Sequence, residues 1–196
     1  MAVHWNGTIH AKTTSVSGFD YAEFFEWEDG NINDEDRIGY VVTLKGDKIA
    51  KANANDRVLG IISGTTAIVG DNPEFGWKNK YLTDEFGRTI YDLVEEFEEI
   101  ENAETNEITK ESMGIFPRPR INPAWNPEEQ YIPREERKEW DKVGLLGKIH
   151  TRDDGTCQVG SCAKVGKDGI LTYTEEDTNM YVMERTSDNI VLIMLK

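Results

Sequence analysis

Short apolar, β-branched runs separated by glycine- and aspartate-rich turns recur along most of this 196-residue chain. In the first half they are Tyr40–Leu44, Lys48–Ala52, Val58–Ile62 and Thr66–Val69, with the tight turn Lys45-Gly46-Asp47 between the first two. Runs of this length bounded by turn formers are typical of strands. They predict a compact barrel-like or clip-like β unit in a mainly β fold, or an α+β fold with a small helical part.

The same pattern returns at Val143 and continues to the C-terminus. Apolar runs joined by Asp-Asp-Gly, Lys-Asp-Gly and Ser-Asp-Asn turns predict a C-terminal β-meander. The last run, Ile190–Leu195, is apolar at both alternating sets of positions. Such a strand is central in its sheet or is covered by another chain.

One segment, Asp92–Glu111, departs from this pattern. Leu93, Val94, Phe97 and Ile100 fall on one side at helical spacing, so the segment is predicted to be a helix or loop inserted into the β fold. It carries nine acidic residues and one lysine, and their repulsion favours an exposed position.

Five prolines between Pro117 and Pro133 break regular structure in the next segment. We expect this stretch to lie extended over a neighbouring surface. The main basic cluster of the chain lies in and after it, and consists of Arg118, Arg120, Arg134 and Arg137. These arginines are predicted to pair either with nearby glutamates or with carboxylates across a subunit boundary.

Acidic and aromatic side chains are most densely mixed between Ser15 and Gly30. Five carboxylates and five rings lie there: Asp20, Glu23, Glu26, Glu28 and Asp29 with Phe19, Tyr21, Phe24, Phe25 and Trp27. Carboxylates that lose water beside rings have a raised pKa, in the range useful for proton transfer. The stretch is a candidate acid–base site, and an amphipathic segment with its acids in water explains the same pattern.

The formal charge of −15 and the isoelectric point near 4.6 argue against nucleic acid or an anionic membrane as a partner. No apolar run approaches the ~20 residues of a membrane span. The opening residues lack the pattern of a signal peptide, so we expect a soluble protein made in a cytoplasm. Three histidines and two cysteines, Cys157 and Cys162, are too few to favour a zinc site, and no metal or cofactor is evident.

Four stretches, in the same order, resemble one known family. They are Asp20–Asn31 (DYAEFFEWEDGN), Ile38–Asp71, Lys80–Arg88 and Tyr131–Cys162. The family is the self-cleaving intramolecular chaperone domain at the C-terminus of phage tail-spike and neck-appendage proteins, classed with glutamic-type autopeptidases. The resemblance covers Asp20 to Lys196. It implies an upstream fibre stub or linker, residues 1–19, and a chaperone domain, residues 20–196.

The resemblance implies a homotrimer that helps the upstream β-helical fibre or tail-spike segment of the same polypeptide to fold, in the host cytoplasm during virion assembly. The domain then releases itself in a single turnover of self-cleavage. The family's Asp-Tyr-Ala-Glu motif falls on Asp20 to Glu23. It implies a scissile bond immediately before or near Asp20, with Glu23 as general base or acid and Asp20 as its carboxylate partner. Two such carboxylates in a ring-lined pocket would titrate as a coupled pair.

Two features leave other interpretations open. Ser17, or Ser15, offers a second route, in which its hydroxyl attacks the preceding carbonyl and leaves an ester for water to open. Phe19 stands where the family is expected to have a small or hydroxyl residue, which favours an alternative: a non-cleaving structural or receptor-binding tip module of a fibre. A hydrolase acting on other molecules is a third hypothesis, and no obvious Ser/His/Asp or Cys/His set supports it.

Overall fold

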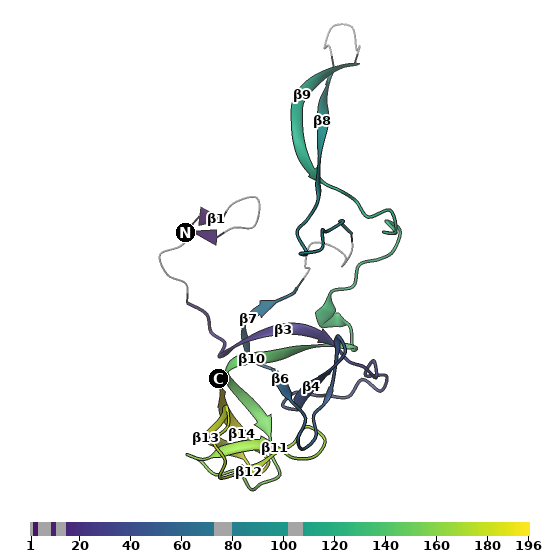
Figure 1. Ribbon diagram of the computed structural model, residues 1–196. Helices are drawn as coiled ribbons and strands as arrows, with labels where there is room; N and C mark the ends of the chain where they lie inside the picture. Colours follow the sequence, from purple (N-terminus) through teal and green to yellow (C-terminus); the bar gives the residue numbers. More distant parts are fainter. Residues whose placement is uncertain (1, 4–8, 11–14, 73–79, 102–107) are drawn as a thin grey trace. The chain divides into compact units, whose positions relative to one another are not determined.

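The computed structural model describes residues 2–3, 9–10, 15–72, 80–101 and 108–196. The chain divides into two compact units, Met1–Asn72 together with Ile132–Lys196, and Pro73–Tyr131. In these ranges every regular element is a strand except one short 3-10 turn, η1, at Arg134–Glu136 (Figure 1). The mainly β prediction is therefore confirmed. None of the described residues form a helix with the length and apolar character that crossing a bilayer requires.

The first unit is built on a ten-stranded sheet with the order β12-β11-β13-β14-β10-β6-β4-β5, and β3 lies off this path between β10 and β7. Its strands are β3 (Asp20–Glu26), β4 (Val41–Lys45), β5 (Lys48–Lys51), β6 (Val58–Ile62), β7 (Thr66–Gly70), β10 (Trp140–Arg152), β11 (Cys162–Val165), β12 (Leu171–Thr174), β13 (Met180–Ser187) and β14 (Ile190–Leu195). Within the part of the chain described, the end strands β12 and β5 do not pair with each other, so the barrel-like expectation is wrong. A separate antiparallel pair joins β1 (Ala2–Val3) to β2 (Ile9–His10).

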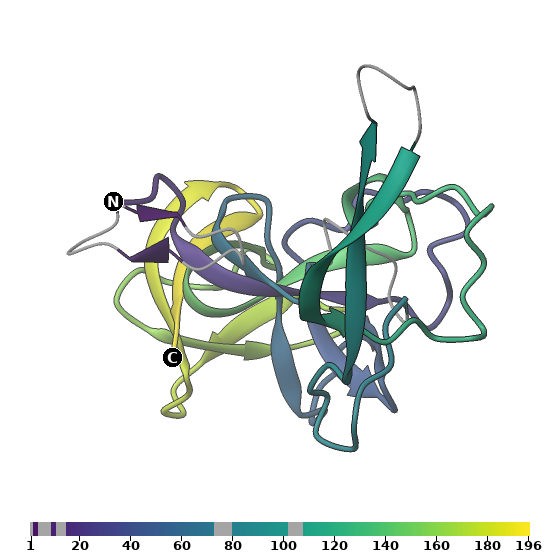
Figure 2. The same cartoon turned by 90° about the horizontal axis from the view of Figure 1, so that it is seen from above.

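Strand β10 connects the two ends of this sheet. It is 13 residues long, which lets Gly147–Arg152 pair with β14 while the earlier part pairs with β3. Figure 1 and Figure 2 show β3 running beside β10. The register shifts between Gly144 and Leu146, opposite the start of β3. This irregularity lies next to Asp20 and shapes its surroundings.

Two apolar clusters stabilise the unit. The larger includes Ile61, Ile149, Leu171, Ile193 and Leu195, and the smaller includes Trp27, Val42, Ile49, Ile62 and Val143. Strand β14 lies between β13 and β10, which confirms the central position predicted for the last apolar run. Burial of its alternate side chains against the larger cluster orients the meander.

The C-terminal meander contains a buried ion pair between Asp153 and Arg185. The Asp153 side chain is fully buried, and its Oδ2 accepts hydrogen bonds from Arg185 Nη2 (2.8 Å) and from the backbone N–H groups of Gly155 (3.1 Å) and Cys157 (3.3 Å). Arg185 also donates to the carbonyl oxygen of Cys157 at 2.6 Å. Burial and the neighbouring acids raise the pKa of the free thiol of Cys157 to about 12, so this thiol stays protonated.

The predicted helix or loop at Asp92–Glu111 is wrong. In the second unit β8 (Tyr91–Glu101) and β9 (Ile108–Pro119) form an antiparallel hairpin, and residues 102–107 lie outside the described residues. A helix would have brought many like charges together. In the hairpin the acids instead face cations across the strands, as in the ion pairs Asp92–Arg120, Glu96–Arg118 and Glu99–Lys110.

The four clustered arginines all pair within the chain. Arg118 and Arg120 bind acids of the hairpin, Arg134 binds Asp71 (2.9 Å), and Arg137 binds Glu139 (2.7 Å). Local pairing was one of the two expectations, although the partners are not the glutamates nearest to the prolines. Pairing across a subunit boundary stays a prediction.

Candidate self-cleavage site

Asp20 is a buried carboxylic acid at the first position of β3. Its side chain is 3% exposed, and its Oδ1 accepts a hydrogen bond from Ser63 Oγ at 3.1 Å. The other oxygen, Oδ2, is buried and has no hydrogen-bond partner in the described structure. Burial raises the pKa of Asp20, although the Ser63 hydrogen bond, its own backbone N–H and the charge of Lys142 act in the opposite direction. Asp20 is therefore suited to carry a proton.

The peptide bond between Phe19 and Asp20 is held from both sides by neighbouring strands. The Phe19 N–H donates to the carbonyl oxygen of Thr65 (3.2 Å), and the Phe19 carbonyl oxygen accepts from the N–H of Lys148 (3.3 Å). A backbone donor at this carbonyl can stabilise negative charge that develops on its oxygen. The candidate bond thus has an acid and a donor beside it.

Two glycines of β10 leave the space that this bond occupies. Gly147 has a φ of +117°, and a side chain there would bring its Cβ to 2.6 Å from the Phe19 carbonyl oxygen. A Cβ at Gly144 would lie 2.7 Å from Asp20 Oδ2. At Gly147 the close atoms belong to the backbone, so glycine is required there for the approach of β10 to Asp20. At Gly144 an added Cβ would push against the ends of the Asp20 and Ile149 side chains.

Glu23 lies on the other face of β3. Side chains alternate along a strand, so Asp20 and Ala22 point inward while Tyr21 and Glu23 point to the more exposed face. The Tyr21 hydroxyl donates to Glu23 Oε1, and this hydrogen bond raises the pKa of Tyr21. The expected coupled carboxylate pair therefore does not form within one chain, and the catalytic roles of Asp20 and Glu23 stay predictions.

Ser17 and Ser15 are exposed, and Ser17 lies in a bend upstream of β3. Among the described residues, no hydrogen bond joins either serine to Asp20 or Glu23. Phe19 is also exposed, at 51% of its side chain. The route through a serine ester has no positioned base in this geometry and stays a prediction.

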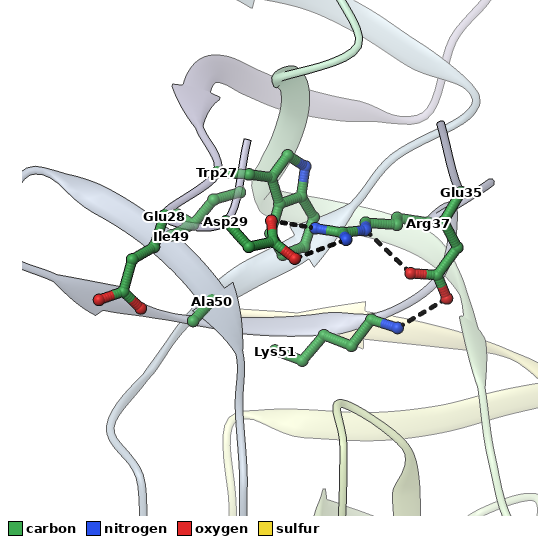
Figure 3. A pocket seen from close by; sticks show the side chains of 8 residues that line it. All are labelled: Trp27, Glu28, Asp29, Glu35, Arg37, Ile49, Ala50 and Lys51. Carbon is green, nitrogen blue, oxygen red and sulfur yellow. Dashed lines mark hydrogen bonds and ion pairs between the residues drawn. The ribbon is translucent and has the colours of Figure 1, made fainter. Parts of the chain in front are cut away.

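Asp29, at the end of the acidic-aromatic stretch, and Glu35 downstream of it have structural contacts. Asp29 binds Arg37 through two hydrogen bonds (2.7 and 2.8 Å), Arg37 also binds Glu35 (3.1 Å), and Glu35 binds Lys51 (2.8 Å), as Figure 3 shows. Arg37 lies over the Trp27 ring at 4.3 Å and lowers the pKa of Asp29 to about 2. These acids are fixed in their charged form and do not suit proton transfer.

Three features of the site were not predicted from the sequence: Ser63, the N–H of Lys148 and the pair Gly144 and Gly147. Each comes from a segment far from Asp20 along the chain. Asp141 was missed as well. It is half-buried, its pKa is raised by desolvation, and it accepts a hydrogen bond from Trp27 Nε1 at 2.7 Å. Asp141 orients the ring on which Arg37 lies.

A buried acid and a backbone donor beside one peptide bond are features that a self-cleaving domain needs. The chain belongs to the Peptidase_G2 family, described as the IMC autoproteolytic cleavage domain, which matches residues 2–189. This confirms the family inferred from the four ordered stretches. Because the match starts near residue 2, the boundary between stub and domain at Asp20 stays a prediction.

Among curated proteins, the chain is similar to pre-neck appendage proteins of two phages. It is 40% identical to that of Bacillus phage B103 over 187 residues, covering 93% of this chain and 19% of the relative. It is 36% identical to that of Bacillus phage phi29, and the match covers 92% of this chain and 20% of the relative. The putative phage-related protein YobO of Bacillus subtilis (strain 168) is 35% identical, with 95% and 21% covered. The chain thus spans about a fifth of each relative.

Two crystal structures have the same fold. One is that of pre-mature bacteriophage phi29 gene product 12, with a TM-score of 0.77, 33% identity, and coverage of 97% of this chain and 24% of that chain. The other is the C-terminal fragment of the same gene product, with a TM-score of 0.69, 33% identity, and coverage of 90% and 100%. The fold is that of a self-cleaving domain found in phage appendage proteins.

Proposed function

We propose that this chain is an intramolecular chaperone that trimerises an upstream phage tail-spike or fibre segment and then releases itself by cutting the bond between Phe19 and Asp20. One observation carries the proposal: a buried carboxyl with a raised pKa and a free Oδ2 lies at this bond. The work would take place in the host cytoplasm during virion assembly. Neither nucleic acid nor a membrane is needed for it.

In the proposed reaction, water attacks the Phe19 carbonyl carbon while the N–H of Lys148 stabilises the oxyanion. The bond between this carbon and the Asp20 nitrogen then breaks, and its electron pair stays on nitrogen. The proton on Asp20 moves to that nitrogen, which belongs to the same residue and whose N–H acts on the pKa of its carboxyl group. A second carboxylate, Glu23, takes the proton of the attacking water.

In this structure Glu23 does not reach the Phe19–Asp20 bond of its own chain. Three residues along a strand span about 10 Å, and Glu23 projects from the opposite face to Asp20. A neighbouring copy must therefore bring its Glu23 over the exposed side of the Phe19–Asp20 bond. This requirement would delay cutting until three chains have assembled.

The exposed side of this bond carries an apolar surface suited to such a contact. Tyr21 is the cross-strand partner of both Ile68 in β7 and Leu146 in β10, so the three form a row on one face. Together with Phe19 they are 36–56% exposed, and we name these four residues the outer patch. Exposed apolar side chains that gather at one place favour association with another protein. Here we assign the outer patch to a second copy of the chain.

Replacing Leu146 with glutamate, alone or with Ile68→Glu, is expected to dissociate the trimer at micromolar concentration. A charge in an apolar contact loses water without gaining a partner. Sedimentation velocity measures the change, and circular dichroism checks that the monomer is folded. The matched control is Ile32→Glu, at a 76% exposed apolar residue outside the outer patch. A trimer unchanged by Leu146→Glu would contradict the contact.

The position of the cut is tested by N-terminal sequencing and intact-mass spectrometry. The chain is joined to a carrier protein upstream of Met1, purified and incubated. The expected new N-terminus is Asp20, read as Asp-Tyr-Ala-Glu. An N-terminus at Ser17 would support the serine ester route instead. No new N-terminus would favour the alternative function, a non-cleaving structural or receptor-binding tip module, which the bulky Phe19 supports.

A further inference from the structure

Ser63 is a buried serine in the turn between β6 and β7, and its hydroxyl orientation is fixed. Its side chain is 4% exposed, and its N–H donates to the carbonyl oxygen of Lys142 at 2.8 Å. Its Oγ accepts a hydrogen bond from the N–H of Thr65 at 3.2 Å. The hydroxyl proton must therefore point away from Thr65, and it is donated to Asp20 Oδ1 at 3.1 Å.

This orientation decides which oxygen of Asp20 can hold a proton. Oδ1 already accepts the hydroxyl proton of Ser63 as a hydrogen bond, which disfavours protonation of the same oxygen. When Asp20 is neutral, its proton thus lies on Oδ2, the oxygen that is buried and has no partner in the described structure. A proton on Oδ2 is not engaged elsewhere and is free to be donated.

From this geometry we propose that Ser63 is a positioning residue for self-cleavage: it holds the Asp20 carboxyl so that the transferable proton sits on Oδ2. The inference rests on the proposed function. In the step concerned, the bond between the Phe19 carbonyl carbon and the Asp20 nitrogen breaks. The electron pair goes to nitrogen, and the Oδ2 proton follows it. Oδ1 keeps the Ser63 hydrogen bond throughout and stabilises the carboxylate that results.

The charged groups around Asp20 are few. On β10 the charge of Lys142 acts on Asp20, and Lys142 is itself ion-paired with Glu135 at 2.8 Å. Strands β6 and β7 contribute no ionisable side chain. On β3 itself, Tyr21 and Glu23 face the other way. A change in the pH dependence on removing Ser63 would therefore report on its hydrogen bond to Asp20.

The test measures the first-order rate of self-cleavage against pH for the full chain with an upstream carrier. Ser63→Ala is expected to slow cleavage by roughly tenfold. The Ser63 hydrogen bond favours the ionised form of Asp20, so its removal should raise the pKa of Asp20. The high-pH limb of the rate profile should therefore move to higher pH. Ser63→Thr keeps the hydroxyl and is expected to restore most of the rate. Should Ser63→Ala not assemble, Ser63→Cys, with a weak donor of similar size, takes its place.

Two control variants separate the possible failures. Thr43→Val removes another buried hydroxyl, which donates to the Arg57 carbonyl oxygen at 2.8 Å, and should leave cleavage unchanged. Asp20→Asn should remove cleavage. Suppose that Asp20→Asn is inactive. If Ser63→Ala then keeps the parent rate, or is slow with an unshifted pH profile, the positioning role of Ser63 is wrong while the proposed function stands. If Asp20→Asn cuts normally, the proposed function itself fails.

Discussion

Chains carrying Glu23→Gln and chains carrying Asp20→Asn are each expected to stay uncut when purified alone, and to regain cutting when they fold together. Loss of a general acid or base slows such a reaction by about 10²- to 10⁴-fold. In a mixed trimer, the Glu23→Gln chain keeps its own Asp20 and receives Glu23 from its neighbour. Only that chain should be cut, and mass spectrometry resolves the two chains when their upstream carriers differ in mass.

The matched control replaces the Asp20→Asn chain with a double variant that also carries Glu23→Gln. This mixture contains no Glu23, and it should remain intact. Absence of cutting in the first mixture, with trimers verified by sedimentation, would show that Glu23 does not act between chains. Either Glu23 would then serve its own chain after a rearrangement of β3, or another group would be the base.

The second large effect concerns stability. Arg185→Ala is expected to destabilise the first unit by about 3 kcal/mol, because it leaves the fully buried charge of Asp153 without its cation. The two backbone N–H groups that remain on Asp153 compensate only in part. For a protein of this size the melting temperature should fall by roughly 10 °C, as measured by differential scanning calorimetry.

Arg88→Ala provides the comparison. Arg88 is ion-paired with Asp84, and its side chain is 75% exposed, so its loss should change the melting temperature little. A melting temperature of Arg185→Ala equal to that of Arg88→Ala would mean that Asp153 is hydrated or relaxes when its partner is removed. The buried pair would then contribute little to the meander.

The strands of the first unit were largely predictable because their signals are local. The four runs between Tyr40 and Val69 are β4 to β7 within one or two residues, and the meander after Val143 is also found. The hairpin β8–β9 was not predicted. Leu93, Phe97 and Ile100 fit helical spacing. The cations that neutralise the acids of β8 lie on β9 or directly after it, far along the chain from those acids.

The site was predictable only in part. Asp20 and Glu23 were identified through a family motif. Their spacing of three residues is compatible with a shared pocket or with opposite faces, and the choice depends on whether the segment is a strand. Ser63, Lys148 and Gly147 meet Asp20 through strand pairing between distant segments. The isolated sequence holds no local signal for such contacts. A glycine indicates a close approach between two strands only when the register of their pairing is known.

The nearness of the Asp20 carboxyl to its own backbone nitrogen has a consequence after the bond is broken. With the proton from Asp20 the amide nitrogen would become an amine, and a second proton, released by the new carboxyl group of Phe19, would make it an α-ammonium group with a usual pKa of about 8. This new cation would lie beside the carboxylate that supplied one of its protons, and the two would neutralise each other. The acid would then be held in its ionised form by its own product, which would disfavour rejoining of the chain.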